Sequence, residues 1–208
     1  GPVGLVRDAD LANNGGTGLA LLNAGAVRVE RVEVSGNAIG IRVTGGGTIP
    51  AVIGHTDLGA GLGNLVDGNQ IAGIQASGNV VVAGNVITGT QDGWGLSLSG
   101  GRAEHNVVID NQDGISAANA AVIGNRIADN DGIGLFAQGA SPIIENVIEG
   151  NAGGIHAVGF GGRIANNVIV DNDSDFESAA IDIDSGVAGL EIANNTIVQR
   201  FAEAIRLE

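Results

Sequence analysis

The sequence contains no cysteine, methionine, tyrosine or lysine, and it has only one tryptophan, four phenylalanines and three prolines in 208 residues. The absence of cysteine excludes disulfides, thiolate catalysis and cysteine-ligated zinc or iron–sulfur sites. Hydrophobic residues still make up 44% of the chain, so any core must be thin and aliphatic. Because proline is scarce and apolar residues are abundant, collagen-like or disordered structure is disfavoured, and the chain is expected to fold.

Positive charge is also scarce. Nine arginines stand against 23 acidic residues, which gives a net charge of −14. Nucleic-acid binding depends on clustered basic side chains that neutralise phosphates, so this balance predicts no nucleic-acid partner. No apolar run approaches the length of a membrane span and no signal-peptide pattern opens the sequence, so no membrane insertion is expected.

What the sequence does contain is a repeat. Segments that follow the template N-x-(I/V)-x-x-N begin at Asn64, Asn85, Asn106, Asn125, Asn146, Asn167 and Asn195. Their starts are 21, 21, 19, 21, 21 and 28 residues apart. Two looser segments, from Ala9 and Val32, bring the number of units to nine.

Within each unit, apolar residues recur with a period of two, which is typical of strands. About 21 residues are too few for a strand–helix unit with its loops, but they suit three short strands with Gly and Asn turns. The predicted fold is therefore all-β: a parallel β-helix of about nine coils, stacked in register at roughly 4.8 Å. The template asparagines are expected to form ladders at two corners, since an amide both donates and accepts hydrogen bonds.

These repeats resemble those of the right-handed parallel β-helix proteins, whose units read N-x-I-x-x-N followed by G-I-x-L. The resemblance covers nearly the whole chain and implies the same right-handed fold. The superfamily includes pectate and alginate lyases, polygalacturonases, uronan epimerases, copper-delivery accessory proteins, phage tailspikes and surface adhesins. The fold therefore does not select one function.

The repeat also predicts the domain organisation. Residues 1–208 are expected to form one β-helix domain, interrupted by loop insertions at about 45–61 and 172–178. The first of these contains His55 and Asp57, which are expected to lie on a protruding loop. Since coils begin and end close to both termini, we expect the domain to be a section of a longer chain.

The second strand of each unit presents the most varied outer column. Phe136, His156 and Asp182 follow one another in successive coils, with Trp94 about two coils before Phe136 and Asp184 beside Asp182. Trp94, Phe136, His156 and Asp182 are the predicted ligand-binding residues, and the aromatic rings are suited to stacking on a sugar. His156, Asp182 and Asp184 are also the candidate catalytic residues, as groups that can remove a proton. A solvated strand with one stray phenylalanine is the alternative interpretation.

A local motif raises the question of calcium. Asp171, Asp173 and Asp175 alternate, and Asp182 follows eleven residues after the first, which matches the ligand spacing of a twelve-residue calcium loop. However, Phe176 occupies the sixth position, where the tight turn requires Gly. Two interpretations of this segment remain: an irregular calcium site and a solvated acidic loop. No other cofactor is predicted.

The sequence argues against copper or zinc delivery, which requires clustered His, Met or Cys. There is no Met or Cys, and His55, His105 and His156 are expected in different columns.

Two functions remain. The first is a non-catalytic β-helix section of a secreted or cell-surface protein, located outside the cell, on its surface or in the periplasm. It would act as a rigid scaffold and as a binding surface for a carbohydrate or a protein. The alternative is a polysaccharide lyase or uronan epimerase, although the chain lacks the Lys and Tyr that many lyases use and the paired motifs of polygalacturonases.

The outer face of the rod and its ends suggest self-association. Unpaired strand edges at the two ends predict end-to-end contacts. An outward aliphatic row that includes Leu65, Val86 and Val107 predicts lateral association or a partner surface, unless these residues simply suit strands.

Overall fold

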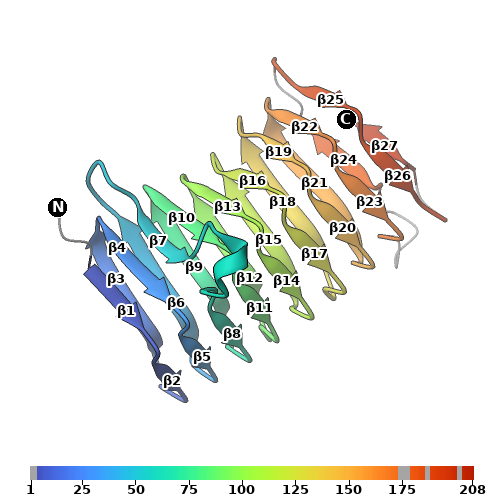
Figure 1. Cartoon of the computed structure of the whole chain (residues 1–208). Helices are drawn as coiled ribbons and strands as arrows, with labels where there is room; N and C mark the ends of the chain where they lie inside the picture. Colours follow the sequence, from blue (N-terminus) through green and yellow to red (C-terminus); the bar gives the residue numbers. More distant parts are fainter. Residues whose placement is uncertain (1–3, 173–178, 186–187, 201–202) are drawn as a thin grey trace.

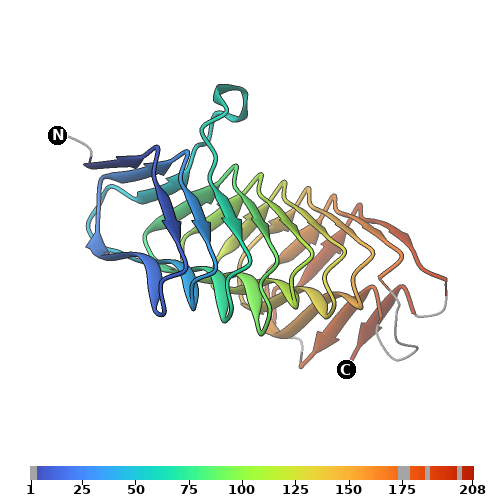
Figure 2. The same cartoon turned by 90° about the horizontal axis from the view of Figure 1, so that it is seen from below.

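The computed structural model is a rod of stacked coils, each built from three short parallel strands (Figures 1 and 2). It describes residues 4–172, 179–185, 188–200 and 203–208. These ranges contain strands β1 to β27 and one short 3-10 helix, η1 (Leu58–Ala60). In this part of the chain, no helix has the length and apolar character needed to cross a membrane.

The strands form three nine-stranded parallel sheets that run along the rod, and each coil contributes one strand to each sheet. Sheet A consists of β1 (Gly4–Arg7), β4 (Val27–Glu30), β7 (Ala51–Gly54), β10 (Val80–Ala83), β13 (Arg102–Glu104), β16 (Ala121–Ile123), β19 (Ile143–Ile144), β22 (Arg163–Ala165) and β25 (Glu191–Ala193). Sheet B consists of β2 (Asp10–Ala12), β5 (Glu33–Ser35), β8 (Leu65–Asp67), β11 (Val86–Thr88), β14 (Val107–Ile109), β17 (Arg126–Ala128), β20 (Val147–Glu149), β23 (Val168–Val170) and β26 (Thr196–Val198).

Sheet C consists of β3 (Thr17–Ala24), β6 (Ile39–Gly45), β9 (Ala72–Gly78), β12 (Trp94–Ser99), β15 (Asp113–Ala118), β18 (Ile133–Gly139), β21 (Gly153–Phe160), β24 (Ile181–Asp184) and β27 (Ile205–Leu207). The chain passes through sheets A, B and C in turn and then rises to the next coil. The predicted right-handed parallel β-helix of nine coils is confirmed.

The core is a set of stacked aliphatic columns inside the rod. Each three-residue strand of sheet B turns its middle residue inward, and Val66, Ile87 and Val108 are fully buried there. Since alternate strand residues point to opposite faces, the period-two pattern determines which residues enter this core. The interior is narrow, and Phe160 is the one fully buried aromatic residue in the described ranges.

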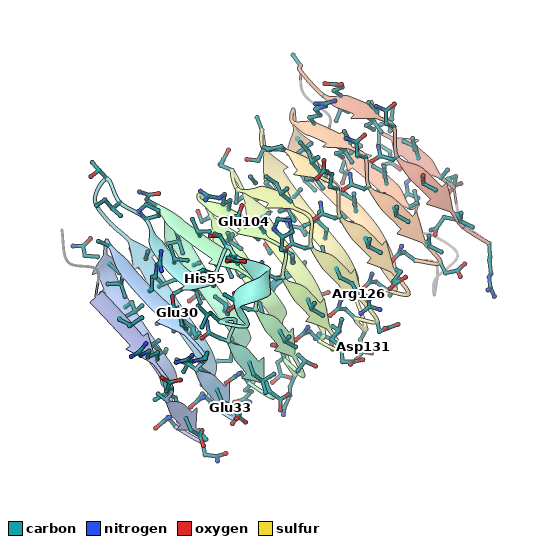
Figure 3. All side chains as sticks on the ribbon, in the orientation of Figure 1. Glu30, Glu33, His55, Glu104, Arg126 and Asp131 are labelled. Atoms are coloured by element: carbon teal, nitrogen blue, oxygen red, sulfur yellow. The ribbon has the colours of Figure 1, made fainter. Side chains whose placement is uncertain are left out.

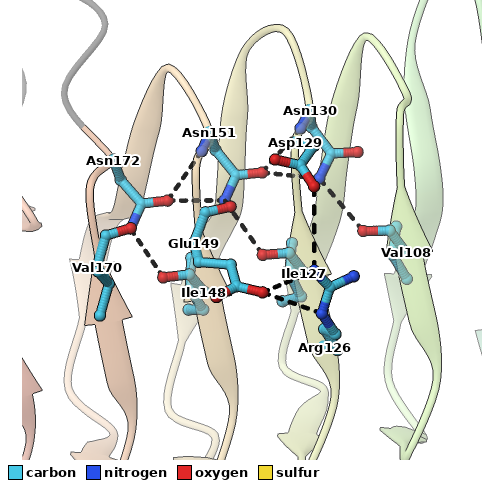
Figure 4. Close-up of polar contacts among 10 residues, drawn as sticks. All are labelled: Val108, Arg126, Ile127, Asp129, Asn130, Ile148, Glu149, Asn151, Val170 and Asn172. Atoms are coloured by element: carbon cyan, nitrogen blue, oxygen red, sulfur yellow. Dashed lines mark hydrogen bonds and ion pairs between the residues drawn. The ribbon is translucent and has the colours of Figure 1, made fainter.

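Two ladders of buried asparagines tie the coils together. In the ladder between sheets A and B, Asn64 Nδ2 donates to Asn85 Oδ1 at 2.8 Å, and Asn85 Nδ2 donates to Asn106 Oδ1 at 2.9 Å. In the ladder between sheets B and C, Asn130 Nδ2 donates to Asn151 Oδ1 at 2.8 Å, and Asn151 contacts Asn172 in the same way (Figure 4). The ladders satisfy corner backbone groups that would otherwise be buried without partners.

The second ladder has one irregular step. Thr90 occupies the corner position between Asn69 and Asn111; its backbone N–H donates to Asn111 Oδ1 at 3.0 Å. Its hydroxyl is the one buried side-chain polar atom in the described residues that has no hydrogen-bond partner.

The predicted loop at 45–61 needs a correction. Ala51–Gly54 form β7 of sheet A, in which Ala51 and Ile53 are fully buried, so this segment belongs to the rod. The excursion comes after β7, where residues 55–64 replace the two-residue corner of other coils and carry η1 away from the rod (Figure 2). Ile53 is a core residue that the spacing of the repeat does not predict, because the excursion separates it from Asn64 in the sequence.

Replacing one ladder residue should measurably destabilise the fold. Asn130→Ala removes a carbonyl that accepts from the backbone N–H and Nδ2 of Asn111, and an amide that donates to Asn151. With buried groups left unpaired, the free energy of unfolding should fall by about 3 kcal/mol. Chemical denaturation measures the change. Gln112→Ala, an exposed amide beside the same ladder, should change it by less than about 0.5 kcal/mol; equal effects would contradict the ladder's structural role.

Candidate binding site on the outer face of sheet C

The outer face of sheet C carries the column predicted from the sequence. Backbone register aligns Gln75, Ser97, Ser116, Phe136, His156, Asp182 and Arg206 on successive strands from β9 to β27. The flanking Leu135 and Ile155 point the other way and are buried in the core. The predicted alignment of this column is therefore confirmed.

Three rings lie next to one another along this face. The ring centroids of Trp94 and Phe136 are 6.1 Å apart, and those of Phe136 and His156 are 5.5 Å apart with the planes at 86°. Trp94 is in register with Asp113, so its indole reaches across β15 to approach Phe136 two coils away. All three rings are only partly buried. The structure thus brings together three of the four predicted ligand-binding residues as a partly exposed aromatic row.

The carboxylates at the end of this row have different partners. Asp182 accepts two hydrogen bonds from Arg206, one of them from Nε at 3.0 Å, and this pairing raises the pKa of the Arg206 guanidinium. Asp184 is exposed, and its Oδ2 lies 4.0 Å from His156 Nε2. A small pocket of about 130 Å³ opens between His156 and Asp182, with Ala179 in its wall.

This arrangement is suited to binding. The rings offer apolar faces, and His156, Asp184 and Ser116 offer hydrogen-bonding groups on the same surface. Asp182 is engaged by a two-point contact with Arg206. The candidate catalytic roles of His156, Asp182 and Asp184 stay predictions.

The proposed calcium ligands can be followed only in part, because Asp173 and Asp175 lie outside the described residues. Asp171 Oδ1 lies 3.2 Å from Arg200 Nε, and Asp182 pairs with Arg206. Both described carboxylates therefore already have cationic neighbours. The described residues give no support to a calcium site.

The histidines are placed differently from the sequence expectation. His55 and His105 are each the first residue after a sheet A strand, so they occupy equivalent corners two coils apart. The excursion after His55 hides this equivalence in the sequence. The two rings point in opposite directions along the rod. His55 Nε2 lies 4.0 Å from Glu30 in the preceding coil (Figure 3), whereas the His105 ring lies against Gly124 in the following coil. His156 lies on sheet C.

The His55 corner is held by local contacts. Asp57 N–H donates to His55 Nδ1 at 3.0 Å, and Asp57 Oδ1 accepts from Gly59 N–H at the start of η1. The carboxylate of Glu30 is nearly buried and also lies 3.5 Å from Arg28 Nη1. The His-x-Asp pair therefore stabilises the turn at the start of the excursion through these hydrogen bonds.

Comparison with known proteins agrees with this architecture. The family model described as "Periplasmic copper-binding protein (NosD)" matches residues 62–187, more than half of the chain. The chain belongs to the NosD family. A search of the curated proteins and a search of the solved structures found no match. The NosD family is periplasmic, which agrees with the extracellular, cell-surface or periplasmic location expected from the sequence.

The residues of this chain do not fit the copper named in the family description. Soft thiolate and thioether ligands are absent because the chain has no Cys or Met. The three histidines do not converge, and no group of three or more His, Asp or Glu in the described ranges is arranged to hold a metal ion. Family membership is therefore shown by the sequence match, but the described surface provides no copper site.

The aromatic row can be checked through its tryptophan, because Trp94 is the sole tryptophan of the chain. Phe136→Ala removes the neighbouring ring at 6.1 Å and should shift the Trp94 emission to longer wavelength and increase its quenching by acrylamide. Val107→Ala, on the outer face of sheet B and away from the rings, is the control and should leave both quantities unaltered. Identical spectra for Phe136→Ala and wild type would show that the two rings do not meet.

The lack of copper ligands predicts that the chain does not bind Cu(I) tightly. Since soft ligands are lacking, Cu(I) mixed with the chain should remain fully available to the colorimetric chelator bicinchoninic acid. Retention of one equivalent of Cu(I) in the presence of the chelator, lost on replacing His55 and His105 with Ala, would contradict this conclusion.

Proposed function

We propose that this chain is a non-catalytic periplasmic β-helix whose sheet C face binds a carbohydrate. The observation that carries the proposal is the partly exposed row formed by Trp94, Phe136 and His156. Large amphipathic rings provide apolar contact area and lose little conformational freedom on binding. In a chain with so few aromatic residues, the gathering of three rings on one outer face favours a ligand with flat apolar faces.

The geometry of the rod supports an elongated ligand. Successive strands of sheet C are about 4.8 Å apart, a rise close to the length of one pyranose unit in an extended polysaccharide. Ring faces can therefore stack on sugar units while polar groups on adjacent strands contact hydroxyls. Such groups flank the rings on both sides, with Ser97 and Ser116 before Phe136 and Asp184 beyond it. A polysaccharide lying along the rod axis would meet one strand per sugar.

The competing function is a polysaccharide lyase or uronan epimerase. The contact of 4.0 Å between His156 and Asp184 is the observation that favours it, since a carboxylate can orient a histidine that removes a proton. Incubation with uronan polysaccharides while recording absorbance of unsaturated products tests for lyase turnover. Turnover that disappears in His156→Ala would replace the binding proposal by this one.

Binding should depend on the ring row. Trp94→Ala and Phe136→Ala should each weaken the affinity for a bound oligosaccharide at least tenfold, about 1.4 kcal/mol, because each removes a stacking surface. Isothermal titration calorimetry with a panel of neutral and acidic oligosaccharides measures the loss. Val107→Ala, on the outer face of sheet B, is the control and should bind as wild type does. Undiminished binding by both ring variants would refute the proposed site.

A further inference from the structure

Arg42 differs from every other arginine of the chain. The other eight each have a side-chain nitrogen within 4.0 Å of a carboxylate oxygen: Arg7, Arg28, Arg31, Arg102, Arg126, Arg163, Arg200 and Arg206. Arg42 makes no such pair with the described residues. Acidic residues outnumber arginines 23 to nine, so an arginine without a carboxylate is the exception here.

The surroundings of Arg42 are neutral and rich in hydrogen-bonding groups. Its Nε donates to Gln75 Oε1 at 2.9 Å, which orients the guanidinium along sheet C. Together they line a pocket of about 270 Å³ whose other polar residues are Thr44, Ser77, Ser97 and Ser99. No Asp or Glu lines this pocket, so the charge of Arg42 is not compensated within it.

The Arg42 guanidinium and the hydroxyls around it favour an anionic ligand. A guanidinium presents a planar fork of N–H donors that matches the two oxygens of a carboxylate or two oxygens of a sulfate. Serine and threonine hydroxyls can donate to the remaining lone pairs of such a group. A neutral ligand would leave the charge of Arg42 unused. The pocket is therefore suited to an oxyanion.

The position of the pocket connects it with the aromatic row. Ser97 and Ser99 belong to β12, the strand that begins with Trp94, and both sites lie on sheet C. A ligand that stacks on Trp94 and extends toward the N-terminal coils would reach Arg42. The oxyanion is then a charged substituent of the same ligand.

We propose that the Arg42 pocket is a second subsite that binds the oxyanion of an acidic sugar residue, so that the ligand of sheet C is an anionic polysaccharide. The identification of the sugar rests on the proposed carbohydrate function. The oxyanion preference itself rests on Arg42 and the hydroxyls around it, and free sulfate shares that chemistry. The two parts can be tested separately.

The first experiment tests the pocket with inorganic sulfate. Nitrogen–proton correlation spectra record the arginine Nε–H signals, and Arg42→Gln identifies the Arg42 signal by its disappearance. Sulfate should shift this signal and leave that of Arg163, which pairs with Glu191, in place. Absence of any sulfate-dependent shift at Arg42 would overturn the oxyanion pocket.

The second experiment tests the ligand class by calorimetry with oligogalacturonate and its neutral methyl ester, which share one sugar backbone. Wild type should bind the free acid at least tenfold more tightly than the ester. Arg42→Gln should abolish that difference, and Arg42→Lys, which keeps the charge but loses the fork, should retain part of it. Arg163→Gln also removes one positive charge from an exposed site and should behave as wild type.

The outcomes separate the two proposals. Equal binding of acid and ester by wild type, with Trp94 still required, would overturn the Arg42 subsite and leave the carbohydrate function standing. A sulfate shift at Arg42 without binding of either saccharide would support the oxyanion pocket and refute the carbohydrate ligand.

Discussion

Register between coils is the constraint on which the rest of this structure depends. Each coil is too small to bury its apolar residues alone, and only stacking at the inter-strand spacing encloses a continuous core. The asparagine ladders make this stacking specific, because a ladder amide bonds to both neighbouring coils: Asn130 Nδ2 donates to Val108 O in the preceding coil and to Asn151 Oδ1 in the following one. A shift of one residue would turn the core columns outward and leave the ladder amides unpaired.

The same register turns the outer surface into columns of aligned positions. Each outward side chain therefore lies directly beside the side chains at the equivalent position of the coils before and after it. Side chains of similar chemistry can in this way form a continuous row along the rod axis. On sheet C this brings hydroxyls, rings and charges into a single line, from Arg42 through Phe136 to Arg206. Rigidity is part of this property, since the positions are held by strands rather than by loops.

Electrostatics in this acidic chain follow a simple rule. Arginines are placed beside carboxylates: Arg31 holds Asp8 through two hydrogen bonds and lowers the pKa of that carboxyl, and Arg206 holds Asp182. Arg42, which has no carboxylate partner among the described residues, is the exception to this rule. The chain belongs to the NosD family, which is described as periplasmic and copper-binding, but the chain has no Cys or Met to supply soft copper ligands. In this member of the family, the aromatic row and the Arg42 pocket both lie on sheet C.

The sequence by itself determined the fold class, the number of coils, the inward positions and the order of residues in the sheet C column, because a regular repeat converts sequence spacing directly into spatial alignment. Where the repeat is interrupted, this conversion fails, which is why Ile53 and the equivalence of His55 with His105 were missed. Only the tertiary structure decided that Trp94 reaches Phe136 across a coil, that Asp182 is engaged by Arg206, and that Arg42 has no carboxylate partner among the described residues. These are contacts between long side chains on different coils, and their rotamers and reach are not encoded in the period of the backbone.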